Sequence, residues 1–146
     1  MEQAMNLHGM YGKLRLFFYR YMYRGFGKRH RDITASEALS ADVIRLMGSP
    51  TVSEFASFVG ISQPNATYKI KNLVKKGYLK KLRSSSDKRV CRLAASEKFE
   101  KLHRESEKPL LQMEERLREQ FTPEEIEIAS RVLDAAYRIM EQGSAT

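Results

Sequence analysis

Two short predicted helices joined by a single glycine constrain this chain most. Thr51 with Glu54 three residues later forms a capping box, which starts a helix that ends near Gly60. Gly60 can adopt the positive φ that a tight turn requires, and Ile61 after it supplies an apolar residue for the core. Ser62 then caps a second helix. This spacing is typical of a helix-turn-helix.

The second helix has an apolar face and a polar face. Its apolar residues, Ala66, Ile70, Leu73 and Val74, recur at helical spacing and predict the buried face. In a helix-turn-helix the opposite face enters the DNA major groove, where Gln and Asn can pair with adenine. A solvated first turn and a partly packed tyrosine are the alternatives. The residues of this helix expected to contact DNA are Ser62, Gln63, Pro64, Asn65, Thr67, Tyr68, Lys71 and Lys75.

Positive charge is concentrated in the middle of the chain. The formal net charge of the 146 residues is +8. Residues 51–93 carry ten Lys or Arg and two acidic residues, residues 1–50 have a net charge of +4, and residues 94–146 have −4. A block of nearly one sign repels itself unless a polyanion is near, so this block indicates a nucleic-acid partner.

A β-hairpin is predicted directly after the second helix. Tyr78–Arg83 and Arg89–Leu93 are the two expected strands, and a serine-rich tip that ends in Asp87 and Lys88 separates them. A basic hairpin in this place makes the helix-turn-helix pattern more specific.

These motifs resemble the MarR family of winged-helix transcription regulators. The resemblance rests on the Asp-x-Arg tip of the hairpin and on the sequence Ile-Ser-Gln-Pro that begins at Ile61; it covers residues 34–96 by motif and the whole chain by helix order. It implies that Asp87 orients Arg89, which enters the minor groove. A salt bridge that only shapes the turn is the alternative for this pair. The expected phosphate contacts of the hairpin are Lys80, Arg83 and Lys88.

The expected fold is mainly α with a small β-hairpin wing. A winged helix-turn-helix over 34–96 would be flanked by dimerisation helices in 1–33 and 97–146, all within one domain. The first helix is predicted over 5–25, ended by glycines at 25 and 27. Pro109 predicts a kink or break in a helix over 97–120. Thr122 with Glu125 starts the last helix.

The resemblance also implies a homodimer, a pseudo-palindromic double-stranded operator and a small apolar or aromatic effector. Aromatic residues on more than one face of the first helix independently favour a dimer. The effector would bind between the dimerisation and DNA-binding parts, although ordinary core packing explains the same residues. The candidate lining is Tyr11, Phe17, Phe18, Tyr21, Met22 and Met47.

Three positions depart from the family pattern. Ser96 replaces a capping threonine, Phe99 replaces a glycine, and Lys69 replaces a common apolar residue of the helix-turn-helix.

Other functions find little support in the sequence. No catalytic motif, cofactor motif or metal-ligand cluster is visible, so we expect neither an enzyme nor a cofactor. Cys91 fits a small buried residue better than a redox sensor, and His103 with Glu107 supplies only two possible metal ligands. One cysteine and the lack of a membrane-spanning segment favour a cytoplasmic protein without membrane contact. The remaining alternatives are an architectural, non-specific DNA binder and a winged-helix module for protein contacts.

Overall fold

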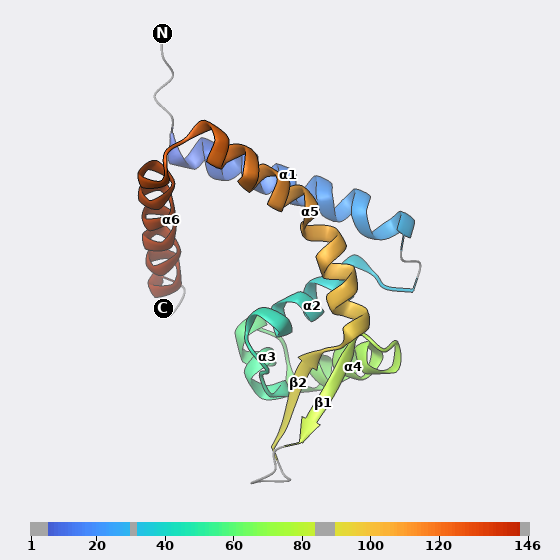
Figure 1. The fold of residues 1–146 in the computed structure, drawn as a ribbon. Coiled ribbons are helices and arrows are strands. Elements are labelled where there is room, and N and C mark those ends of the chain that lie inside the picture. Colours follow the sequence, from blue (N-terminus) through green and yellow to red (C-terminus); the bar gives the residue numbers. More distant parts are fainter. Residues whose placement is uncertain (1–5, 30–31, 84–89, 144–146) are drawn as a thin grey trace. The chain divides into compact units, whose positions relative to one another are not determined.

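The fold is a winged helix with additional helices before and after it (Figure 1). The computed structural model describes residues 6–29, 32–83 and 90–143. These residues form two compact units: unit 1 ends at Arg104, and unit 2 begins at Glu105. This confirms the mainly α fold with a hairpin wing. The elements are α1 (Leu7–Arg29), α2 (Ala35–Leu46), α3 (Val52–Val59), α4 (Gln63–Lys75), β1 (Leu79–Arg83), β2 (Cys91–Ala95), α5 (Glu97–Gln120) and α6 (Pro123–Gly143).

Capping boxes start three of the helices, and the one at α3 was predicted as such. At α3, the Thr51 N–H donates to Glu54 Oε2 over 2.7 Å, and the Glu54 N–H donates to Thr51 Oγ1 over 3.1 Å. The same reciprocal pair joins Thr34 with Glu37 at the start of α2. A third pair joins residues 122 and 125 before α6. Each pair satisfies N–H groups that would otherwise have no partner, which fixes where each helix begins.

A left-handed glycine produces the turn between α3 and α4. Gly60 has φ 69° and ψ 37°, and the Ile61 N–H donates to the Ala56 carbonyl over 3.0 Å. The turn brings the apolar faces of both helices into one core with α2, the hairpin and the start of α5. The buried residues of this core are Ile33, Ala38, Ala41, Ile44, Phe55, Ala56, Ala66, Ile70, Leu73, Tyr78, Leu79, Leu93, Phe99 and Leu102.

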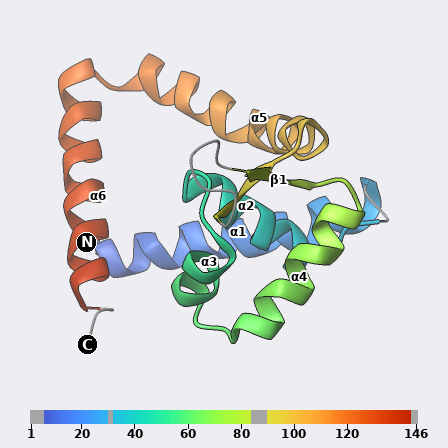
Figure 2. The ribbon, with the colours of Figure 1, turned by 90° about the horizontal axis from the view of Figure 1, so that it is seen from below.

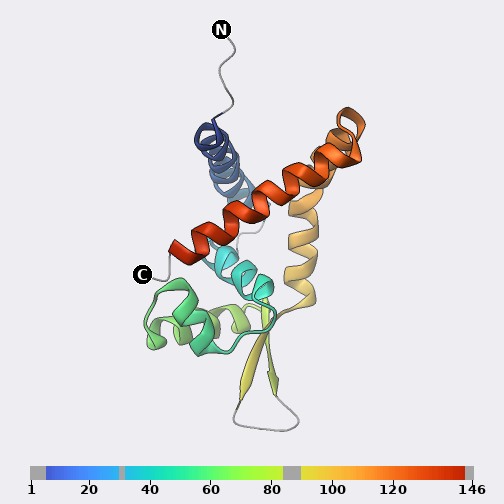
Figure 3. The ribbon, with the colours of Figure 1, turned by 90° about the vertical axis from the view of Figure 1, so that its left-hand side faces the viewer.

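The two strands form an antiparallel hairpin that extends away from α2, α3 and α4 (Figure 3). Leu79 pairs with Ala95, and Arg83 pairs with Cys91. The predicted second strand, Arg89–Leu93, was therefore placed two residues too early. The strand continues through two alanines because they complete the ladder opposite Leu79 and Lys80. The Leu93 N–H also donates to the Pro50 carbonyl over 2.8 Å, which ties the wing to the turn before α3.

Two helices continue through residues that were expected to interrupt them. α1 continues through the glycines at 25 and 27 to Arg29, so the prediction that they end the helix was wrong. Glycine weakens a helix without breaking it, because its backbone can still make the helical hydrogen bonds. Likewise, α5 continues through Pro109, so of the two expected outcomes, a kink or a break, the break does not occur. Proline removes one N–H donor, here the partner of the Glu105 carbonyl, and the adjacent turns continue the helix.

The second unit is a helical hairpin made from the end of α5 and from α6. Leu110, Met113 and Leu117 of α5 line a groove together with Ile126 and Leu133 of α6. No residue of α6 is fully buried. Ile126, Ala129 and Leu133 of α6 thus face α5 within this unit.

No helix in the described part of the chain has the length and apolar character needed to cross a membrane.

Candidate nucleic-acid interface

α4 presents one exposed face to solvent along a side of the winged helix (Figure 2). Its N-terminus is fixed by Ser62, whose Oγ accepts a hydrogen bond from the Asn65 N–H over 3.4 Å. Ala66, Ile70 and Leu73 are buried, as predicted. The exposed residues are Gln63, Pro64, Asn65, Tyr68, Lys71 and Lys75, with Thr67 half-buried at the margin.

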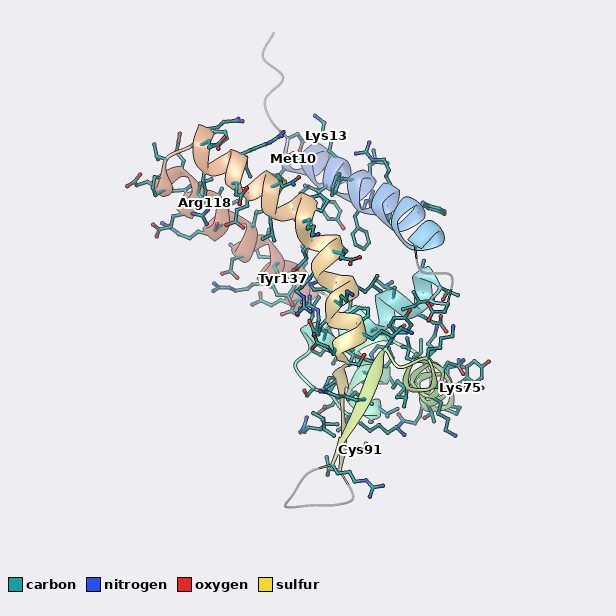
Figure 4. The ribbon with its side chains drawn as sticks, turned by 45° about the vertical axis from the view of Figure 1, so that its right-hand side comes forward. Met10, Lys13, Lys75, Cys91, Arg118 and Tyr137 are labelled. Atoms are coloured by element: carbon teal, nitrogen blue, oxygen red, sulfur yellow. The ribbon has the colours of Figure 1, made fainter. Side chains whose placement is uncertain are left out.

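The side chain of Tyr68 is the largest on this exposed face. It is 68% exposed, and among the described residues it makes no hydrogen bond or ring contact. A partly packed tyrosine was the alternative to DNA contact; about two-thirds of the side chain is open to a partner, and its contact with DNA stays a prediction. Lys75 lies at the end of the same face and points outward from the winged helix (Figure 4).

The ten basic residues of 51–93 fall into distinct groups. Three have partners within unit 1. Lys69 Nζ donates to Ser36 Oγ over 3.1 Å, which accommodates this departure from the family pattern. Lys76 is paired with an acid of α2, and Arg92 donates to the Ser49 carbonyl over 3.0 Å. Five make no hydrogen bond or ion pair with any described residue: Lys71, Lys75, Lys80, Lys81 and Arg83. These five side chains are exposed and can approach phosphates.

The predicted tip of the wing lies outside the described residues. Asp87, Lys88 and Arg89 belong to it, so the proposed minor-groove contact stays a prediction. The strands that carry this tip are held at their base by Arg92, which also lies 3.6 Å from Glu54 Oε2.

An ion pair joins the end of α4 to α2. Lys76 Nζ lies 2.9 Å and 2.8 Å from the two carboxylate oxygens of Glu37. Partial burial disfavours the charged carboxylate, but the hydrogen bonds from Lys76 and Thr34 outweigh it, so the pKa of Glu37 is lowered. The side chain of Lys76 is therefore engaged in holding α4 in place and is not available to a phosphate.

A second polar cluster connects the segment before α2 with the wing and α5. The Tyr78 hydroxyl donates to Asp32 Oδ1 over 2.7 Å, and Lys98 Nζ donates to Asp32 Oδ2 over 2.8 Å. These hydrogen bonds, from Lys98 first and Tyr78 second, lower the pKa of Asp32 to about 2. Burial and the Asp32 carboxylate raise the pKa of Tyr78. Sequence reasoning missed this cluster, because 46 and 66 residues separate the partners.

The start of α5 packs into the winged helix. Phe99, where the family pattern has glycine, is 2% exposed and meets the Tyr78 ring edge-on, with centroids 6.5 Å apart. The hydroxyl of Ser96 accepts a hydrogen bond from the Phe99 N–H, so serine performs the expected capping. His103 Nδ1 lies 3.6 Å from Asp42 Oδ1. Within the described ranges no three His, Cys, Asp or Glu residues form a group that could hold a metal ion.

The remaining sequence hypotheses concern Cys91 and the effector. Cys91 is half-buried at the start of β2, so the expectation of a buried residue holds only in part. Tyr11, Phe17 and Phe18 are exposed on α1, whereas Met47 packs against the winged-helix core. The side chains of Tyr21 and Met22 lie outside the described part of the structure. The effector pocket stays a prediction.

Residues 42–91 match the MarR family model, a span that includes α3, α4, β1 and the start of β2. FabT of Streptococcus pneumoniae, solved in complex with DNA, is 25% identical, with a TM-score of 0.65 over 94% of this chain and 99% of that one. The match to this family model thus covers about a third of the chain, and the likeness in fold to FabT covers nearly all of it. No curated relative matches the sequence.

Other solved structures share the fold at lower identity. A mutant MepR from a multidrug-resistant clinical isolate of S. aureus is 15% identical, with a TM-score of 0.74 over 94% of this chain and 99% of that one. The adhesin competence repressor AdcR of Streptococcus pyogenes is 20% identical, with a TM-score of 0.57 over 93% and 98%. The chain thus shares the fold of these proteins along nearly its whole length.

Proposed function

We propose that this chain is a dimeric repressor that binds a specific, pseudo-palindromic sequence of double-stranded DNA. The exposed face of α4 carries the proposal: it combines hydrogen-bonding side chains near the helix start with cations that have no partner among the described residues. α4 would lie in the major groove and the hairpin in the minor groove. The complex of FabT with DNA and the naming of AdcR as a repressor support this assignment by analogy.

The residues of the interface divide by what they can contact. Gln63 and Asn65 have amide groups that can pair with base edges, and they lie in the first turn of α4. Lysines and arginines contact phosphates, which contribute affinity and fix the position of the protein without reading the sequence. Proposed phosphate contacts are Lys71, Lys75, Lys80, Lys81, Arg83 and Lys88, with Asp87 and Arg89 at the tip of the wing.

Exposed apolar faces on α1 and α6 support the dimer. α6 carries two apolar stripes, of which one lines the groove against α5. The other stripe includes Ile128, Val132 and Ile139, all exposed, with Ile139 at 69%. A surface of this kind is stable in water once a second copy covers it. We assign residues 1–33 and 97–146 to dimerisation and residues 34–96 to DNA binding.

An apolar or aromatic small molecule would release the repressor from DNA. Exposed aromatic rings on α1, among them Tyr11, Phe17 and Phe18, support this part of the proposal. A loss of DNA affinity in the presence of an aromatic acid or a fatty-acyl compound, with the dimer intact, would establish it. Unchanged affinity across both classes would count against it.

Selection of binding sites from a random pool of DNA duplexes tests the proposal. We expect enrichment of one inverted repeat, with half-site centres about one helical turn apart. An architectural protein would retain DNA without enriching any sequence, and a protein-interaction module would retain none. Either result would contradict the proposed function.

A further inference from the structure

A shallow hollow lies on the exposed face of α4. Its lining comprises Gln63, Pro64, Thr67, Tyr68 and Lys71. Residues three or four positions apart, such as 63 and 67, 64 and 68, and 68 and 71, lie next to each other on a helix, so the five share one side over two turns. The proline ring, the threonine methyl group and the tyrosine ring make the walls apolar, while an amide and an ammonium group lie at the two ends.

Nothing in the described part of the chain covers this hollow. Tyr68 is 68% exposed, whereas the residues on the opposite side of α4 are buried. An exposed tyrosine keeps an apolar ring in water and a polar hydroxyl free, which suits a partner that offers both kinds of contact. The flanking cations Lys71 and Lys75 favour a partner whose surface carries many negative charges.

The major groove of DNA offers one apolar group, the C5-methyl of thymine. Cytosine has a hydrogen at the same position, and the edges of guanine and adenine present hydrogen-bonding atoms. An apolar hollow on a helix in that groove therefore matches thymine and no other base. Tyr68 and Thr67 are placed to form its walls.

We propose that the hollow formed by Pro64, Thr67 and Tyr68 binds the C5-methyl group of a thymine in each half-site, so that these residues determine the sequence specificity of α4. This inference rests on the proposed function. It names the chemical group that the hollow binds. It differs from the alternative in which the Tyr68 hydroxyl contacts a phosphate.

The test removes the methyl group alone from the DNA. In the duplex enriched by selection, each thymine is replaced in turn by deoxyuridine, and the dissociation constant is measured by fluorescence anisotropy. Burial of one methyl group, at about 0.8 kcal/mol, predicts that one position in each half-site weakens binding roughly fourfold when substituted. Substitution in both half-sites predicts a loss of roughly fifteenfold.

Protein variants test whether the loss of affinity for deoxyuridine duplexes arises at the hollow. Tyr68→Ala and Thr67→Ser should bind thymine and deoxyuridine duplexes with nearly equal affinity, because the walls that contact the methyl group are reduced. Lys80→Ala serves as the matched control: it should weaken binding to both duplexes and keep the fourfold ratio. Circular dichroism checks that each variant is folded, which we expect since Tyr68 is outside the core.

The outcomes separate this inference from the proposed function. Selective binding to the enriched duplex with no deoxyuridine penalty, or a penalty that persists in Tyr68→Ala, would overturn the thymine hollow alone. Tyr68→Phe keeps the aromatic wall and should keep the fourfold ratio, so loss of the deoxyuridine penalty in this variant would assign it to the hydroxyl and overturn the inference. No selective binding at all would refute both.

Discussion

Adjacent lysines at the end of α4 should behave differently when each is replaced by alanine. Lys75 is exposed and has no partner among the described residues, whereas Lys76 binds both carboxylate oxygens of Glu37. The chemical change is the same in both variants, and the positions are neighbours. Lys75→Ala should therefore weaken DNA binding, and Lys76→Ala should weaken the fold.

The first effect, the weakening of DNA binding in Lys75→Ala, is measured from the salt dependence of binding. The logarithm of the binding constant falls with the logarithm of salt concentration, with a slope of about −0.9 for each phosphate neutralised. A dimer presents each lysine twice, so Lys75→Ala should reduce the slope by about 1.8. Lys76→Ala should leave the slope unchanged.

The second effect, the weakening of the fold in Lys76→Ala, is measured as a loss of stability. The side chains of Lys76 and Glu37 are 35% and 15% exposed, so their pair is partly screened by water. Loss of such a pair lowers the free energy of unfolding by about 1 kcal/mol. That corresponds to a decrease in melting temperature of roughly 2–4 °C. Lys75→Ala should melt like the wild type.

Anisotropy titrations at four or more salt concentrations, together with thermal melts, measure both effects on the same samples. Equal reductions in slope for the two variants would refute the division of cations into paired and unpaired groups. A melting temperature for Lys76→Ala equal to that of the wild type would also refute it.

Three further predictions concern assembly, the turn and the response to acid. Ile139→Asp should convert the dimer to monomer in light scattering, and a dimer of unchanged stability would exclude this face from the interface. Gly60→Ala should lower the free energy of unfolding by about 1–2 kcal/mol, because alanine disfavours the positive φ of 69° at this position. No atom lies near the added methyl group, so the backbone conformation alone sets this cost. An unchanged free energy in urea unfolding would argue against the left-handed turn. Asp32 has its pKa lowered from 3.8 to about 2 by hydrogen bonds from Lys98 and Tyr78, so it stabilises the fold above that range, and the stabilisation disappears as the pH falls from about 4 to 2. Asp32→Asn should lack this part of the acid dependence, and identical unfolding curves between pH 2 and 5 would contradict the role of the cluster.

Local features of this fold were predictable from the sequence because their partners are close along the chain. A capping box joins residues three apart, so Thr51 and Glu54 specify the start of α3 without any tertiary contact. The faces of α4 likewise follow from helical spacing. The turn required only a glycine at position 60.

Long-range contacts were not predictable in this way. The sequence alone does not show that Lys76 pairs with Glu37, 39 residues away, or that Arg92 binds the Ser49 carbonyl, 43 residues away. The count of ten basic residues therefore overestimated those available to DNA. The predicted end of the second strand was wrong for the same reason, because the pairing of β2 with β1 determines where β2 ends.

The central claim is that α4 reads a DNA sequence, and the affinity ratio between the enriched duplex and a scrambled duplex tests it most directly. Measured by anisotropy at fixed physiological salt, the ratio should reach at least about 10³ for the wild-type dimer. It should fall substantially for Gln63→Ala, while binding to scrambled DNA stays unchanged. Equal affinities for the two duplexes, with steep salt dependence for both, would contradict sequence readout by α4.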